Sequence, residues 1–125
     1  HYGIQTGIAF QIIDDILDFV GKSEDIGKPV GNDLQQGLLT LPALYYIEDN
    51  PEDSDVTFLR NGHKNDQAIY ERIIQSISAS TAIDSSIAEA HQYVESAKSA
   101  LQNLPDCKYL DAMYTIADYV VERQF

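Results

Sequence analysis

The sequence predicts an all-α fold, arranged as an antiparallel helix bundle. Apolar residues recur at spacings of three and four along most of the chain, whereas the strand-like alternation of apolar and polar residues is nearly absent. Short runs that contain glycine or proline separate the periodic stretches, and such connections join antiparallel neighbours. With 125 residues, 44% of them hydrophobic, the chain is long enough for one compact domain, and we expect no second full domain.

Five helices are expected, of which the first two lie in the N-terminal part of the chain. The first spans residue 2 to about residue 20, and Gly21 closes it before a loop rich in glycine and proline. Thr40 predicts the N-cap of the second, because Pro42 suits the first turn of a helix. Residues 49–51, Asp-Asn-Pro, end this second helix.

The remaining chain predicts three further helices. The acidic stretch Glu52 to Asp55 is expected to be a solvated loop, and Asn61-Gly62 marks a turn. After that turn one apolar stripe contains Ile69, Ile73 and Ile77. A longer seam contains Ile83, Ile87, Ala90, Val94, Ala97, Leu101 and Leu104. Pro105 stops that helix, and the last helix carries Leu110, Met113, Ala117 and Val120.

Composition excludes several classes of function. Eight Lys and Arg against twenty Asp and Glu give a net charge of −12, which would repel a nucleic acid, so we expect no nucleic-acid partner. No apolar run approaches the roughly 18 residues of a membrane-spanning helix, so the chain is expected not to span a membrane. Cys107 is the only cysteine, which excludes an internal disulfide and fits a reducing, cytoplasmic location.

The first helix carries a polar stripe on an otherwise apolar surface. Taking Gln11 as zero and turning about 100° per residue, Asp14 falls at about −60°, Asp18 at about −20° and Asp15 at about +40°. Gly7, at about −40°, lies one turn earlier on the same face and leaves room for a close approach. Because most of the remaining circumference is apolar, the helix is expected to be buried on most sides and the stripe to face a cleft.

Three carboxylates in one arc repel each other. At about 5 Å and an effective dielectric near 20, each pair costs on the order of 3 kcal/mol. Protonation of one carboxyl group could offset this, but an oxygen-ligated Mg²⁺, which also takes phosphate oxygens, suits a site without soft ligands better. The alternative is a solvated acidic face. The motif is not an EF-hand loop, because residues 14–18 lack oxygens at alternate positions and the following glycine.

Three blocks of sequence, in order, carry a family resemblance. They are F-Q-I-I-D-D-I-L-D-F at residues 10–19, G-K-P-V-G-N-D-L at residues 27–34 and G-L-L-T-L-P at residues 37–42. Together they resemble the trans-isoprenyl diphosphate synthases. The resemblance is strong over residues 2–46, and beyond residue 46 it extends only to the helical character of the chain. The first block is similar to the second aspartate-rich motif of that family, which faces a first such motif across a central cavity.

The resemblance implies roles for five residues. Asp14 and Asp18 would bind Mg²⁺ that bridges to the allylic diphosphate, with Asp15 either beside them or just behind the direct ligands. Gln11 matches the glutamine that lines the cavity next to the reacting chain, and Lys28 matches the loop lysine that holds the diphosphate. The alternative for Lys28 is a solvated loop lysine.

Two further positions matter for the diphosphate. Asp33 matches the acid of the family's G-x-D segment and would tether the loop, unless it is an exposed turn aspartate. Leu38 stands where many members have a lysine in G-K-x-T, which puts a second phosphate contact in doubt.

The implied reaction is prenyl transfer, in which isopentenyl diphosphate attacks the cation formed from an allylic diphosphate. The chain holds only one D-D-x-x-D, so the first motif is missing and we interpret residues 1–125 as the C-terminal part of an isoprenoid synthase fold. The isolated chain is expected to be inactive, and the missing N-terminal half or a homodimer would have to complete it. The alternative is a non-catalytic helical subunit or interaction module with a partner-facing acidic stripe.

Overall fold

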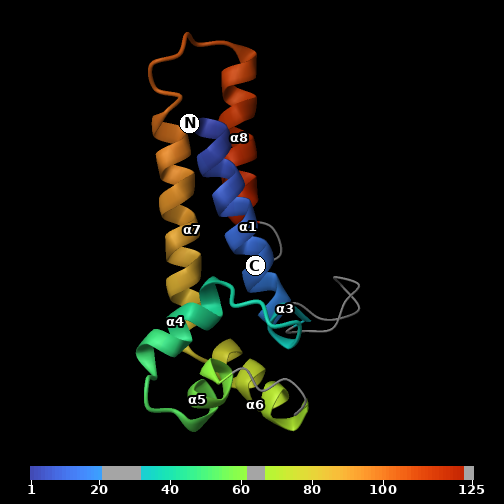
Figure 1. Ribbon diagram of the computed structural model, residues 1–125. Coiled ribbons are helices and arrows are strands. Elements are labelled where there is room, and N and C mark those ends of the chain that lie inside the picture. Colours follow the sequence, from blue (N-terminus) through green and yellow to red (C-terminus); the bar gives the residue numbers. More distant parts are fainter. Residues whose placement is uncertain (21–31, 62–66, 123–125) are drawn as a thin grey trace. The chain divides into compact units, whose positions relative to one another are not determined.

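The computed structural model describes residues 1–20, 32–61 and 67–122 and is all-helical over these ranges, as predicted (Figure 1). The predicted helix end at Gly21 and the loop that holds Lys28 lie outside the described residues. The described helices are α1 (Tyr2–Val20), α3 (Asn32–Gln35), α4 (Leu41–Asp49), α5 (Ser54–Arg60), α6 (Gln67–Ser78), α7 (Thr81–Ser99) and α8 (Lys108–Glu122). Five of them are the expected helices, and the short helices α3 and α5 are additional.

The chain divides into two compact units. The first unit holds residues 1–14 together with the described residues from Ile87 onward, and the second unit holds the described residues from Asp15 to Ser86. The boundaries fall within α1 and within α7, so each of these helices contributes one end to each unit.

The first unit is built on the apolar seam of α7. The seam residues Ala90, Val94, Ala97 and Leu101 are buried, as are Ala117, Val120 and Val121 of α8. Two polar contacts tie the helices of this unit together. Lys98 of α7 forms an ion pair of 2.9 Å with Asp118 of α8, and the Tyr2 hydroxyl of α1 donates a hydrogen bond of 2.7 Å to the Met113 carbonyl of α8. In Figure 1, α7 and α8 run side by side in opposite directions.

Helix α7 ends earlier than the sequence predicts. It stops at Ser99, and Leu104, expected at the end of the seam, is 48% exposed. Beyond Ser99 the main-chain bonds tighten to three-residue spacing, as in Leu101 N–H to Lys98 C=O at 3.0 Å. Such turns rotate each residue further than an α-helix does, so the heptad spacing no longer points residue 104 toward the seam.

The second unit has a core to which each of its described helices contributes. Its buried members are Phe19, Leu34, Ala43, Tyr46, Val56, Tyr70, Ile73, Ile74, Ile77 and Ala82. The predicted stripe of α6 supplies two of them, Ile73 and Ile77, while Ile69 packs at the edge. Phe58 of α5 meets Tyr70 edge to face at a centroid distance of 5.7 Å, a geometry that aromatic quadrupoles favour.

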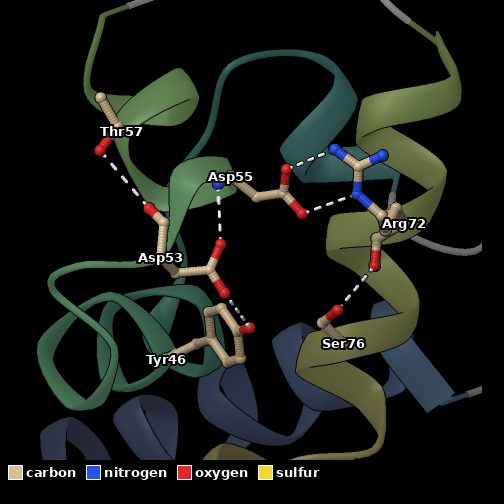
Figure 2. Close-up of polar contacts among 6 residues, drawn as sticks. All are labelled: Tyr46, Asp53, Asp55, Thr57, Arg72 and Ser76. Carbon is tan, nitrogen blue, oxygen red and sulfur yellow. Dashed lines mark hydrogen bonds and ion pairs between the residues drawn. The ribbon is translucent and has the colours of Figure 1, made fainter.

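The prediction that Glu52 to Asp55 forms a solvated loop is right for Glu52, which is exposed in a turn, and wrong from Ser54 onward, where α5 begins. The Asp53 carboxylate accepts a hydrogen bond of 2.7 Å from the Asp55 N–H, which caps the helix that begins at Ser54. Asp53 also accepts from the Tyr46 hydroxyl at 3.1 Å, and Asp55 pairs with Arg72 of α6 (Figure 2). These acids hold α5 against its neighbours rather than facing bulk water.

Helix α4 begins where the sequence predicts, but its cap works differently. Thr40 has the extended backbone of an N-cap and Pro42 stands in the first turn. The Thr40 side chain makes no capping hydrogen bond, and its buried Oγ1 has no partner within the described part of the chain. Proline lacks an N–H, so it reduces the number of main-chain donors that a cap would have to satisfy.

Candidate functional site

The four stripe residues of α1 differ steeply in exposure. Gln11 and Asp14 are exposed, Asp15 is half-buried and Asp18 is only 1% exposed. The apolar residues Ala9, Ile12, Ile13, Ile16, Leu17 and Phe19 are buried as expected, whereas Phe10 and Val20 are exposed. A Cβ added at Gly7 would meet nothing within 4 Å, so the described chain leaves this face of the helix open.

Asp18 connects α1 to the segment that carries Asp33. Its Oδ2 accepts a hydrogen bond of 3.1 Å from the Asp33 main-chain N–H. That N–H lies in the first turn of α3, where main-chain donors have no partner inside the helix. A carboxylate from a distant helix therefore satisfies a donor that the four-residue helix cannot satisfy itself.

The segment after Asp33 closes on itself. The Asp33 carbonyl accepts from Leu38 N–H at 2.9 Å, and the Leu34 carbonyl accepts from Gly37 N–H at 3.0 Å. These are the two bonds of a Schellman motif, which needs a left-handed residue, and Gly37 has φ of +86°. The glycine of the third resemblance block is therefore required by the turn that ends α3, and Leu34 anchors this turn in the core of the second unit.

The end of α1 is held by a second polar contact. The Ser78 hydroxyl at the end of α6 donates a hydrogen bond of 3.0 Å to the Phe19 carbonyl. Phe19 lies near the end of the described part of α1, so this hydrogen bond ties that end to α6. Sequence periodicity does not predict this contact, because a serine at the end of a helix is expected to be exposed to solvent.

The acidic stripe of α1 is the candidate metal site of this chain. Among the described residues no group of three or more His, Cys, Asp or Glu side chains lies close enough to hold a metal ion. Carboxylate oxygens are nevertheless the ligands that Mg²⁺ prefers, and Mg²⁺ commonly takes one or two of them and completes its shell with water and phosphate oxygens. Leu38 is exposed, and as an apolar side chain it offers a phosphate no charge.

The comparisons with known proteins identify relatives of the whole chain. The model of the polyprenyl synthetase family matches residues 1–80. The chain is 39% identical to component 2 of the heptaprenyl diphosphate synthase of Bacillus subtilis, over 99% of this chain and 35% of that protein. It is 32% identical to the octaprenyl diphosphate synthase of Escherichia coli, over 98% of this chain and 38% of that protein.

Solved structures agree with the sequence matches. The heptaprenyl diphosphate synthase of Staphylococcus aureus superposes with a TM-score of 0.92 at 31% identity, covering 99% of this chain and 39% of that one. A polyprenyl synthase of Caulobacter crescentus, complexed with calcium and isoprenyl diphosphate, gives a TM-score of 0.84 at 32% identity, covering 99% and 38%. The chain thus spans well under half the length of these relatives. Within the described residues no helix is long and apolar enough to cross a membrane.

Proposed function

Because the chain belongs to the polyprenyl synthetase family, we propose that it supplies one side of the active site of a prenyltransferase. The reaction is the condensation of isopentenyl diphosphate with an allylic diphosphate. The observation that carries the proposal is the D-D-x-x-D stripe of α1, on a chain similar in fold to a synthase complexed with a divalent cation and isoprenyl diphosphate.

Asp14 and Asp15 are the residues of this chain proposed to hold Mg²⁺. Asp14 is exposed on α1, so its carboxylate can reach an ion that keeps part of its water. When bound, Mg²⁺ would neutralise charge on the departing diphosphate. The resemblance implies the same role for Asp18, whose side chain is 1% exposed and whose Oδ2 accepts a hydrogen bond from the Asp33 N–H.

The chain's other site residues would act on the organic substrate and its diphosphate. In the proposed reaction the allylic carbon–oxygen bond breaks, diphosphate leaves, a carbon–carbon bond forms and a proton is lost. Gln11, exposed on α1, would lie next to the reacting chain. Lys28 would offer the diphosphate a point charge, and Asp33 would tether the loop that carries Lys28.

Activity requires more protein than this chain. We propose that residues 1–125 form the C-terminal part of the enzyme, and that the opposite aspartate-rich motif and the isopentenyl diphosphate site come from the remainder or from a second copy. The family's chemistry needs both sides, so the chain alone is expected not to transfer prenyl groups.

A graft tests this proposal. The chain replaces the matching part of the Staphylococcus aureus heptaprenyl diphosphate synthase, and prenyl transfer is measured with both diphosphates and Mg²⁺. The graft is expected to be active, and Asp14→Asn to lower its rate at least about a hundredfold, in line with the loss of an electrostatic group in a site of this kind. A graft that unfolds cooperatively yet is inactive, or equally active with Asp14→Asn, would contradict the proposal and favour a non-catalytic helical module.

A further inference from the structure

We propose that Asp18 is a positioning residue, which fixes the Asp33 segment against the end of α1, rather than a ligand of the metal. The structural basis of the inference is the hydrogen bond from the Asp33 N–H to Asp18 Oδ2. Its significance for catalysis rests on the proposed function. The three acids of one motif would then have two different roles, metal binding for Asp14 and Asp15 and positioning for Asp18.

Burial separates Asp18 from the other acids. A hydrated Mg²⁺ is reached most readily by a carboxylate that projects into water, as the exposed Asp14 does. Asp18 is 1% exposed and already accepts a main-chain hydrogen bond. An ionised acceptor makes a stronger hydrogen bond than a neutral one, so the bond from the Asp33 N–H offsets part of the cost of burying the Asp18 carboxylate.

Asp33 is well suited to being held in this way. Its N–H is bonded to Asp18, and its carbonyl is bonded to the Leu38 N–H at 2.9 Å. Leu34 beside it is fully buried in the core of the second unit. The main chain at Asp33 is therefore fixed from both sides, and the contact with Asp18 is the one that reaches the aspartate-rich helix.

The acceptor itself is also fixed. Asp18 precedes Phe19, whose ring is buried and whose carbonyl accepts from Ser78. The last turn of α1 is thereby tied to α6 and to the core, so it can serve as a reference point for the Asp33 segment. The contact with the Asp33 main chain fixes one oxygen of Asp18 at the end of α1, and a positioning residue depends on such a contact.

Amide hydrogen exchange on the 125-residue chain tests the contact directly. Asp18→Ala removes the acceptor, and the Asp33 amide is expected to exchange about tenfold faster, the equivalent of one lost hydrogen bond. Asp18→Asn keeps an oxygen at the same place, and the Asp33 amide is expected to stay within about threefold of the wild-type rate. The amide of Ile73, a buried core residue of the second unit, should be unchanged in both variants, which shows that this unit still folds.

Binding of inorganic diphosphate with Mg²⁺ separates positioning from ligation. Asp18→Asn is expected to keep the wild-type affinity within about threefold, while Asp14→Asn loses at least about tenfold, because only the latter removes a ligand charge. Asp18→Asn that weakens binding as much as Asp14→Asn, or that exposes the Asp33 amide as Asp18→Ala does, would overturn the inference. If the wild-type chain binds no diphosphate at all, the proposed function fails, while the exchange rates still decide the role of Asp18.

Discussion

The guanidinium group of Arg72 forms a two-point ion pair with the Asp55 carboxylate, with Nε 2.9 Å from Oδ2 and Nη2 2.5 Å from Oδ1 (Figure 2). The pair joins α6 to the first turn of α5. The Arg72 contact holds the pKa of Asp55 below its ordinary value of 3.8, against the opposing effect of burial. The matching of the planar guanidinium to both carboxylate oxygens makes this contact directional as well as electrostatic.

Replacing Arg72 should therefore weaken the fold in a pH-dependent way. Because the Arg72 side chain is 59% exposed, Arg72→Met is expected to cost no more than about 1 kcal/mol at neutral pH. A carboxyl group whose pKa is lower in the folded chain than in the unfolded chain stabilises the fold at pH values above its unfolded pKa. This stabilisation is lost as pH falls through the pKa of the folded chain. The gap in unfolding free energy between wild type and variant should close below pH 3.8. Arg60→Met, at an exposed arginine, is the control, and a gap of constant size at all pH values would contradict the assignment.

Tyr46 should show the opposite pH dependence. Burial and the hydrogen bond to Asp53 raise the pKa of Tyr46 above its ordinary value of 10.0. Tyr46 therefore stabilises the folded chain at pH values below the pKa that it has in the unfolded chain. This stabilisation is lost as pH rises through the higher pKa of the folded chain, so the free energy of unfolding should fall in alkali. Tyr46→Phe is expected to cost about 1 kcal/mol at neutral pH, measured by urea unfolding. The variant should also lose less stability than wild type above pH 10.0; an equal loss would count against this role.

The two N-caps should respond differently to substitution. Asp53→Ala removes the acceptor for the Asp55 N–H and is expected to destabilise the chain by about 1–2 kcal/mol. Thr40→Val removes a buried hydroxyl oxygen that makes no capping bond, and is expected to be neutral or stabilising. Thermal unfolding of both variants measures this contrast. A Thr40→Val loss as large as that of Asp53→Ala would show that the Thr40 hydroxyl does cap α4.

The contact between Ser78 and Phe19 should stabilise the fold by the free energy of one hydrogen bond. Ser78→Ala leaves the Phe19 carbonyl in a partly buried place without this donor, so the expected loss is about 1 kcal/mol in the free energy of unfolding. Ser99→Ala, at an exposed serine at the end of α7, is the matched control and should stay within about 0.5 kcal/mol. Equal effects of the two substitutions would mean that the contact carries no net stabilisation.

Hydrophobic spacing was sufficient to predict the longer helices. The repeats that predict α6 and α7 contain the residues that are buried there, such as Ile73, Ile77 and Val94. Helices α3 and α5 were missed because four and seven residues are too short to show a 3.6-residue repeat. They depend instead on local devices, the Asp53 cap and the glycine turn at Gly37.

The candidate site was predictable only in part. Helical geometry places Asp14, Asp15 and Asp18 on one arc, and α1 confirms that a single helix carries them. The angular position of a residue on a helix does not predict whether another segment of the chain buries its side chain. Asp18 accepts a hydrogen bond from the Asp33 segment, which ends in the glycine turn at Gly37, and periodicity along α1 gives no sign of this contact.

The most direct test of the central claim is calorimetric titration of the 125-residue chain with inorganic diphosphate, with and without Mg²⁺. A chain with a net charge of −12 should repel the anion unless a cation is bound, so binding is expected only when Mg²⁺ is present. Asp14→Asn should weaken that binding at least about tenfold, while Asp49→Asn, the same change at an exposed acid of α4, should leave it unaltered. Binding that does not need Mg²⁺, or that both variants weaken alike, would contradict a metal-diphosphate site on α1.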